Sequence, residues 1–92
     1  MPATRPRVSA IVVNWNGGAL LDECLASLTA QTLLDLEIVV VDNASTDGSF
    51  DRARQHYGDR LVCLANARNE GFARGNNQAF AVARGEWMFL LN

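Results

Sequence analysis

The 92-residue sequence contains no lysine, and all eight of its cationic residues are arginines. Within this stretch a Walker-type phosphate-binding loop and any Schiff-base chemistry are therefore excluded, because both need a lysine. The formal net charge is only −2, so no strongly basic surface is available to hold nucleic acid or an anionic membrane. We therefore expect no nucleic-acid partner.

Long apolar runs and cysteine motifs are also missing. No apolar run approaches the roughly 20 residues that span a bilayer, and the start of the chain lacks the apolar segment of a signal peptide. The two cysteines, Cys24 and Cys63, lie on apolar positions without CxxC spacing, which predicts two buried reduced thiols rather than a disulfide or redox pair. These features fit a reducing, cytoplasmic compartment.

Apolar runs alternate with amphipathic stretches after a flexible lead-in at residues 1–7. Runs rich in β-branched residues that stop at polar or glycine-containing turns predict strands. Their alternation with helical stretches predicts an α/β fold, a Rossmann-like parallel sheet with order 3-2-1-4 flanked by helices. The expected strands are residues 8–13, 37–41, 61–64 and 87–91.

Three helices are expected between these strands, because apolar residues recur there at helical spacing. The second helix is expected over residues 47–57, the third ends at Gly85, and residues 32–35 connect the first helix to the second strand. The expected buried faces are Leu20, Leu21, Cys24, Leu25 and Leu28 in the first helix, Phe50, Ala53 and Tyr57 in the second, and Phe72, Asn76, Ala79, Phe80 and Ala83 in the third.

The second strand is the most apolar part of the chain, with four β-branched residues at 38–41. Such a run is typical of a central strand that is buried on both faces. Asp42 follows directly, so we expect it to face the crevice where open α/β sheets bind ligands. There it would accept a hydrogen bond from a base N–H or a ribose hydroxyl, unless it caps a helix or forms a salt bridge. Ser45 and Asp47 are expected to cap the next helix.

Polar turns follow each of the first three strands. Because the carboxyl ends of parallel strands meet at one edge of a sheet, we expect these turns to converge on a ligand. Trp15 lies in such a turn, which favours a flat surface for a nucleobase over a packing role. The three polar clusters are Asn14, Trp15 and Asn16, then Asp42 and Asn43, then residues 66–77.

Within the third cluster, the motif at residues 69–77 has glycines at the expected start of a helix. Gly71 and Gly75 suit the close approach of a ligand or of another backbone segment, and free amides there attract phosphate. Arg74 could clamp a diphosphate or be a solvated surface residue. Asn76 lies on the inward stripe, where a polar side chain needs a partner, either a ligand or a second loop.

Taken together, VSAIVVNWNGG, EIVVVDNASTDGS and NEGFARGNNQAF resemble the N-terminal half of family 2 glycosyltransferases, which have the GT-A fold. The third motif resembles their rhamnosyltransferase-like branch. The resemblance implies that residues 8–92 are the nucleotide-sugar-binding portion of an enzyme of polysaccharide assembly. Such an enzyme transfers a sugar from a UDP- or dTDP-sugar to a glycan or lipid-linked acceptor, in the cytoplasm or peripherally at the cytoplasmic face of the membrane.

By position, the resemblance also implies roles for single residues. Val13 and Trp15 would contact the base and ribose, Asp42 would bond to the base, and Gly71 with its neighbours would line the pocket. Many members of the family have arginine where this chain has Asn76. The expected substrate-binding residues are Val13, Asn14, Trp15, Asn16, Asp42, Asn43, Asn69, Gly71, Arg74 and Asn76.

The resemblance places the metal site outside this chain. The family's DxD motif directly follows the fourth strand, which here means beyond Asn92, so Mg²⁺ or Mn²⁺ is expected in the full-length enzyme only. We expect no catalytic residue, no metal ligand and no transferase activity in these 92 residues. The strand at 86–91 would be an open apolar edge, which predicts homo-oligomers through it.

Two other functions fit the pattern less well. A dinucleotide-binding domain of an oxidoreductase should carry G-x-G-x-x-G after the first strand, where this chain has Asn-Trp-Asn-Gly-Gly. The other alternative is a non-enzymatic interaction module whose asparagine-rich turns serve only as structural caps. A flavodoxin-like receiver is disfavoured by the absence of lysine.

Overall fold

The computed structural model describes residues 6–31 and 35–91. Residues 1–5 of the expected lead-in, residues 32–34 of the expected connection and Asn92 lie outside the described residues.

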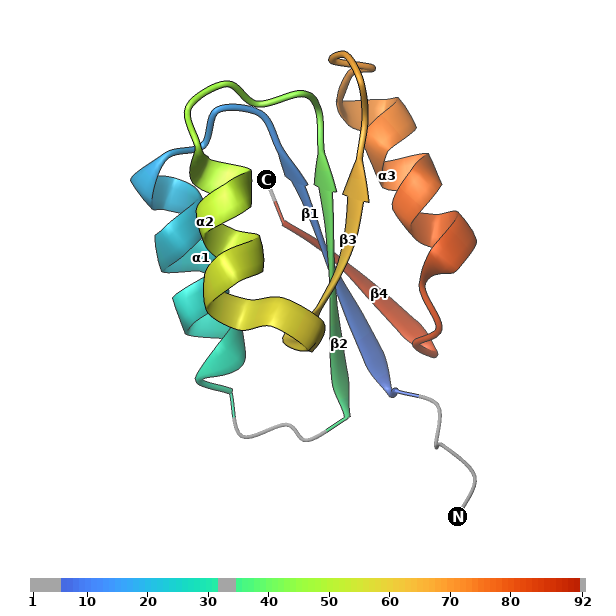
Figure 1. Ribbon diagram of the computed structural model, residues 1–92. Coiled ribbons are helices and arrows are strands. Elements are labelled where there is room, and N and C mark those ends of the chain that lie inside the picture. The colour runs from blue at the N-terminus through green and yellow to red at the C-terminus, as the bar shows by residue number, and fades with distance from the viewer. Residues whose placement is uncertain (1–5, 32–34, 92) are drawn as a thin grey trace.

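Four parallel strands form a single sheet with the order β3-β2-β1-β4 (Figure 1). The predicted order, 3-2-1-4, is confirmed. Each predicted strand end lies within one residue of the observed one, because the apolar runs stop abruptly at polar turns. The strands are β1 (Val8–Asn14), β2 (Leu36–Asp42), β3 (Leu61–Ala65) and β4 (Trp87–Leu91).

Helices cover both faces of the sheet. α1 (Ala19–Thr29) and α2 (Ser49–Tyr57) lie on one face and α3 (Phe72–Val82) lies on the other (Figure 1). A short 3₁₀ helix, η1 (Gly58–Arg60), links α2 to β3. The result is the three-layer arrangement expected of right-handed crossovers between parallel strands.

The two central strands supply both apolar cores. Side chains alternate along β1 and β2, so Ile11, Val39 and Val41 pack against Ala79 of α3. Their neighbours face the other helical layer, where the core consists of Ala10, Val12, Leu21, Leu25, Leu28, Ile38, Val40, Phe50, Ala53 and Leu61. Burial on both faces explains why β2 is an unbroken apolar run in the sequence.

Three residues expected on buried helix faces lie outside them. Leu20, in the first turn of α1, is 74% exposed, and Phe72 and Phe80 of α3 are also exposed. α3 meets the sheet through small residues instead. A Cβ atom added to Gly75 would lie 2.8 Å from Cγ1 of Val13, so the helix sits too close for a phenylalanine at the contact.

Cys24 and Cys63 are both free, as predicted, but each is only partly buried. Both pack against the core on the α1 and α2 side. Burial raises the pKa of both thiols, and the nearby Arg54 partly opposes this rise at Cys63. The raised pKa disfavours the reactive thiolate form.

A polar cluster closes the amino-terminal edge of the sheet. Oε1 of Glu37 accepts hydrogen bonds from Ser9 Oγ at 2.7 Å and from the backbone N–H of Arg84 at 2.9 Å. The N–H of Gly85 donates to Ser9 Oγ at 2.9 Å. A Cβ atom at Gly85 would lie 2.5 Å from the backbone nitrogen of Ser9, so this connection to β4 requires glycine.

We therefore expect Gly85→Ala to lower the free energy of unfolding by roughly 1–3 kcal/mol, the cost of overpacking a tight contact. Urea denaturation followed by circular dichroism measures this change. Glu86→Ala, at the exposed neighbouring position, is the control and should leave the midpoint unchanged. Equal midpoints for all three proteins would show that the contact at Ser9 relaxes without cost.

The β4 strand presents apolar side chains on both of its faces. Trp87 is 67% exposed, and Met88, Phe89 and Leu90 are also exposed. Within the described residues β4 pairs only with β1, so its other edge keeps unpaired backbone groups. Exposed, apolar edge strands tend to pair with another chain.

We predict that the 92-residue chain self-associates through β4 and that Phe89→Lys shifts it toward the monomer. Light scattering over a concentration series measures the apparent mass. Leu20→Lys introduces the same charge at an exposed leucine of α1 and should leave the association unchanged. A wild-type chain that stays monomeric at high concentration would contradict the prediction.

Candidate functional site

The three polar clusters meet at the carboxyl edge of the sheet, at the top of Figure 1. Asn14, the last residue of β1, pairs in register with Asp42 of β2, which pairs with Ala65 of β3. The backbone continues the ladder past the strands, because Asn43 N–H donates to Asn14 O and Asn66 N–H donates to Asp42 O, both at 2.8 Å. The expected convergence of the clusters is therefore confirmed.

Asp42 is only 4% exposed, so it is buried within this edge, whereas the sequence predicted that it faces a crevice. Oδ1 accepts hydrogen bonds from Asn14 Nδ2 at 2.9 Å and from Ser45 Oγ at 2.6 Å. Oδ2 accepts one from the N–H of Ser45 at 3.0 Å. β2 is central, so loops from both sides cover its end. The carboxylate still has acceptor capacity, because it offers about four lone-pair positions and three are used.

Ser45 ties the loop after β2 to the turn after β1. Its Oγ accepts a hydrogen bond from the N–H of Asn16 at 2.9 Å, and Oδ1 of Asn16 accepts one from the N–H of Thr46 at 2.7 Å. Asn16 adopts a positive φ of 50°, a conformation that asparagine tolerates better than most residues. Ser45 therefore links two loops and does not cap α2, which corrects the prediction.

Asp47 does cap α2. Its Oδ1 accepts hydrogen bonds from the N–H of Ser49 at 3.0 Å and from Ser49 Oγ at 2.6 Å. Its Oδ2 accepts one from the N–H of Gly18 at 2.9 Å, before α1. These bonds, those from Ser49 above all, lower the pKa of the Asp47 carboxyl group below its ordinary value. One carboxylate thus holds the starts of two helices.

Asn43 organises the opposite flank of the edge and is 2% exposed. Its Nδ2 donates to the backbone oxygen of Gly71 at 3.1 Å, and its Oδ1 accepts from Asn66 Nδ2 at 2.8 Å. Asn66 also forms a reciprocal pair with Gln78 of α3, with bonds of 2.8 and 2.9 Å. The roles of Asn66 and Gln78 were not predicted from the sequence. The place of Asn66 after β3 was a signal, whereas nothing in the sequence marks Gln78.

Trp15 lies in the turn after β1 with 58% of its surface exposed, so its ring is not part of either core. Val13 is partly buried and packs under α3. Asn69 and Gly71 are exposed in the loop before α3, where Asn69 Oδ1 accepts a hydrogen bond from the N–H of Gly71 at 2.9 Å. Gly71 has a φ of 89°, which favours glycine.

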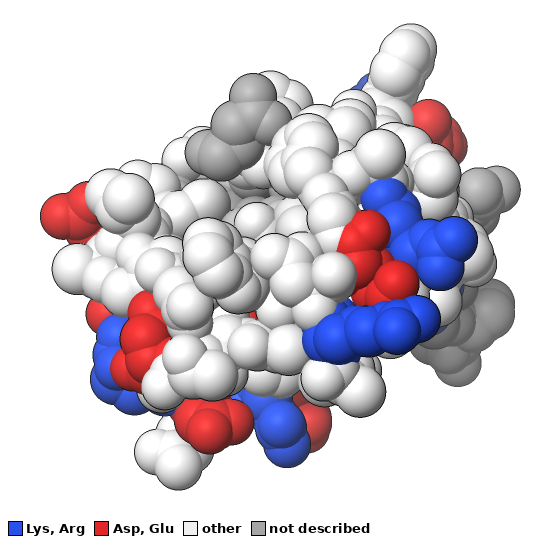
Figure 2. All heavy atoms as spheres, turned by 90° about the horizontal axis from the view of Figure 1, so that it is seen from above, with Lys and Arg blue, Asp and Glu red and all other residues white. Residues whose placement is uncertain are grey.

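Two arginines flank one glutamate on the rim beside α3. Arg68 Nε lies 3.2 Å and Arg74 Nη1 lies 3.5 Å from the carboxylate of Glu70, and both guanidinium groups are largely exposed. Figure 2 views the molecule from above this edge. Much of the middle of the face is uncharged, and a mixed group of acidic and basic side chains lies to the right of its centre.

Asn76 is 5% exposed, and no described residue donates a hydrogen bond to its Oδ1 atom. The predicted tie between two loops is therefore not formed by residues 6–31 and 35–91. A buried acceptor without a partner costs about 1–3 kcal/mol. The side chain lies on the sheet-facing side of α3, between Gly75 and Ala79.

The described part of the chain does not form a metal centre. It holds no group of three or more histidine, cysteine, aspartate or glutamate side chains arranged to bind a metal ion. Asp42 and Asp47 already accept hydrogen bonds on both of their carboxylate oxygens.

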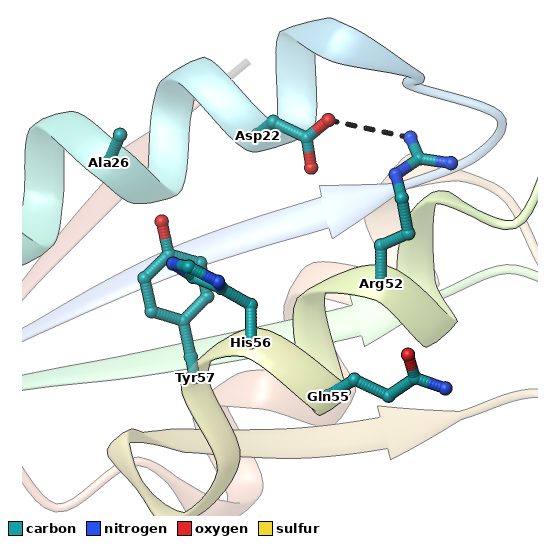
Figure 3. Close-up of a pocket in the computed structure, with 6 residues that line it drawn as sticks. All are labelled: Asp22, Ala26, Arg52, Gln55, His56 and Tyr57. Atoms are coloured by element: carbon teal, nitrogen blue, oxygen red, sulfur yellow. Dashed lines mark hydrogen bonds and ion pairs between the residues drawn. The ribbon is translucent and has the colours of Figure 1, made fainter.

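A groove between α1 and α2 is separate from the predicted site (Figure 3). It encloses about 660 Å³, and the Asp22–Arg52 ion pair of 3.4 Å crosses it. None of the predicted substrate-binding residues lines it. The lining residues are Asp22, Ala26, Arg52, Gln55, His56 and Tyr57.

Comparisons with known proteins agree with this arrangement of sheet and loops. The fold matches solved glycosyltransferases of GT-A architecture, which places the chain in the class of glycosyltransferase domains. The profile of glycosyl transferase family 2 matches residues 9–92. The chain belongs to glycosyl transferase family 2.

Three relatives illustrate the match. A PGL/p-HBAD biosynthesis glycosyltransferase of Mycobacterium bovis is 34% identical over 89 residues, which cover 94% of this chain and 34% of that protein. The mannosyltransferase PcManGT of Pyrobaculum calidifontis, solved with GDP-Man and Mn²⁺, is 35% identical with a TM-score of 0.78, over 90% of this chain and 26% of that one. TarS of S. aureus (residues 1–349), solved with UDP-GlcNAc, is 29% identical with a TM-score of 0.80, over 92% and 26%. The chain thus spans about a third or less of these proteins.

Because the pKa of Asp47 is lowered, its hydrogen bonds to Gly18 and Ser49 should depend on pH. They stabilise the fold at pH values above the ordinary pKa of aspartate, and this stabilisation is lost as the pH falls through the lower pKa of the folded protein. Carboxyl and amide NMR titrations should show the amide signals of Gly18 and Ser49 following the Asp47 carboxyl group. Asp59→Asn, at an exposed residue of η1, should leave that titration unchanged, whereas Asp47→Asn should abolish it. Amide signals of Gly18 and Ser49 that do not change with pH would contradict this assignment.

Proposed function

We propose that the whole protein transfers a sugar from a nucleoside diphosphate donor to a glycan or lipid-linked acceptor, and that the carboxyl edge of this sheet binds the nucleotide. The observation that carries the proposal is the convergence of Trp15, Asp42 and the Gly71 loop at that edge. Relatives solved with GDP-Man and with UDP-GlcNAc support the ligand class.

Exposure divides the site residues into two groups. We propose that the exposed ones touch the nucleotide: Trp15 stacks on the base, Asn16 lies beside it, and Arg74 at the rim approaches the diphosphate. Asn69 and Gly71 line the opposite side, and Val13 lies beneath. The buried residues are Asn14, Asp42, Asn43 and Asn76. Asn14, Asp42 and Asn43 hold the loops in place through their hydrogen bonds, and Asp42 and Asn76 keep acceptor capacity for a ligand.

Two buried acceptors suit donors on the ligand. The unused acceptor position of Asp42 fits the N–H of a base or a ribose hydroxyl. The unpartnered Oδ1 of Asn76 fits a ribose or sugar hydroxyl, which would remove the cost of its burial. We propose these two contacts as the source of selectivity for the nucleotide.

A divalent metal belongs to this proposal only for the whole enzyme. PcManGT was solved with Mn²⁺, and Mg²⁺ or Mn²⁺ would stabilise the charge that develops on a departing diphosphate. The described residues hold no cluster that fits such an ion, so we assign no metal ligand to them. From the family resemblance we also propose that the catalytic residues lie outside this chain. We propose that this chain binds nucleotide without transferring sugar by itself.

The finer assignments rest on the sequence. The motif NEGFARGNNQAF supports a place in the rhamnosyltransferase-like branch of the family. A cytoplasmic location, or a peripheral one at the cytoplasmic face of the membrane, is proposed for the whole protein. In the part of the chain that the structure describes, no helix has the length and apolarity needed to cross a membrane.

Calorimetric titration of the chain with UDP, GDP, dTDP and NAD⁺ tests the proposed function. We expect binding of at least one nucleoside diphosphate and a loss of about 1–3 kcal/mol in Asp42→Asn, the scale for a charged hydrogen-bond partner. Asp59→Asn is the matched control. A response to NAD⁺ alone would favour the oxidoreductase alternative, and no response to any nucleotide would favour an interaction module. Equal binding by Asp42→Asn would remove Asp42 from the ligand contacts.

A further inference from the structure

The loop between β3 and α3 depends on side-chain amides for its position. Three amide groups, those of Asn43, Asn66 and Gln78, form a continuous chain of hydrogen bonds from the end of β2 to the middle of α3. The bonds between them measure 2.8 to 2.9 Å. At its β2 end this chain reaches the loop itself, because Asn43 Nδ2 donates to Gly71 O.

Asn43 makes a second direct contact with this loop, because the N–H of Glu70 donates to Asn43 Oδ1 at 3.4 Å. The backbone bond to the sheet comes from Asn66, the bond from Gly71 N–H to Asn69 is local to the loop, and Glu70 pairs with the largely exposed Arg68 and Arg74. Among the described residues, no side chain caps the amino-terminal N–H groups of α3. Its contact with the sheet runs through Gly75 and Ala79, which offer little side-chain surface to lock a position.

The direction of each amide is fixed by its partners. Asn43 uses its oxygen toward Asn66 and its nitrogen toward Gly71, so a flipped amide would place like groups against each other. Asn66 and Gln78 each donate and accept in their reciprocal pair. A network in which every member is satisfied in one orientation specifies a single arrangement of the groups that it connects.

We infer that Asn66 and Gln78 are positioning residues that act through Asn43 to set the place of Gly71, and with it the nucleotide affinity of this edge. The inference rests on the proposed function. Gln78 lies seven residues after Gly71 and is only partly buried, and we assign it no contact with the ligand. Its influence passes through Asn66 and Asn43 to the backbone oxygen of Gly71.

The variant Gln78→Glu tests this inference, because it removes the Nε2 donor to Asn66 and keeps an acceptor in its place. We expect faster amide hydrogen exchange confined to residues 69–74, and a Kd for the nucleoside diphosphate that is raised roughly threefold to tenfold, the range for one hydrogen bond. Gln55→Glu makes the same change on the exposed face of α2 and should alter neither quantity. Gln78→Met, which favours a helix and removes both bonds, replaces Gln78→Glu if that variant does not fold.

Each result decides the inference. Faster local exchange with weaker binding supports it. Unchanged exchange at residues 69–74 overturns it, and so does faster exchange with unchanged affinity, which would reduce the network to a structural role. If the wild-type chain binds none of the nucleotides, the proposed function is wrong. That result differs from a failure of this inference, because it appears in the wild-type chain without any substitution.

Discussion

The carboxyl edge of this domain is organised by two adjacent side chains, Asp42 and Asn43, at the end of the central strand. Successive side chains of an extended segment point to opposite sides, so the two serve opposite flanks. Asp42 accepts hydrogen bonds from Asn14 and Ser45, on the side of α1 and α2. Asn43 accepts a hydrogen bond from Asn66 and donates one to the backbone oxygen of Gly71, on the side of α3.

This division explains how a small sheet holds three loops in defined positions at one edge. Parallel strands with crossover helices bring three loops to one edge but leave their mutual positions open. Here hydrogen bonds between buried polar groups fix the positions of the loops. Breaking one of these bonds would leave a buried polar group unpaired, which costs free energy of folding. Asp47 adds a surface anchor by holding the N–H groups of Gly18 and Ser49 together.

Asn76 is the exception to this pattern of satisfied groups, because its oxygen lacks a donor within the described residues. Buried polar groups are usually paired, so an unpaired one beside a polar edge points to a partner of another kind. The proposed nucleotide sugar would supply such a partner, since it is rich in hydroxyl donors. The exposed apolar surface of β4 lies at the outer edge of the sheet, beside β1, and none of the polar turns contributes to it.

The sequence by itself determined the sheet, the order of its strands and the convergence of the polar turns. Those features follow from local rules: unbroken apolar runs mark buried strands, and parallel crossovers allow few arrangements. The three motifs also sufficed to identify the family that the comparisons establish.

Only the tertiary structure decided which side chains are buried and which amides meet. The close approach of α3 through Gly75 turns Phe72 and Phe80 outward, and no helical periodicity reveals the distance between a helix and a sheet. Asp42 proved to be buried because loops from both flanks close over the end of β2. Gln78 found its partner across the α3 interface, since hydrogen bonds between side chains far apart in the chain depend on distances that exist only once the layers have packed.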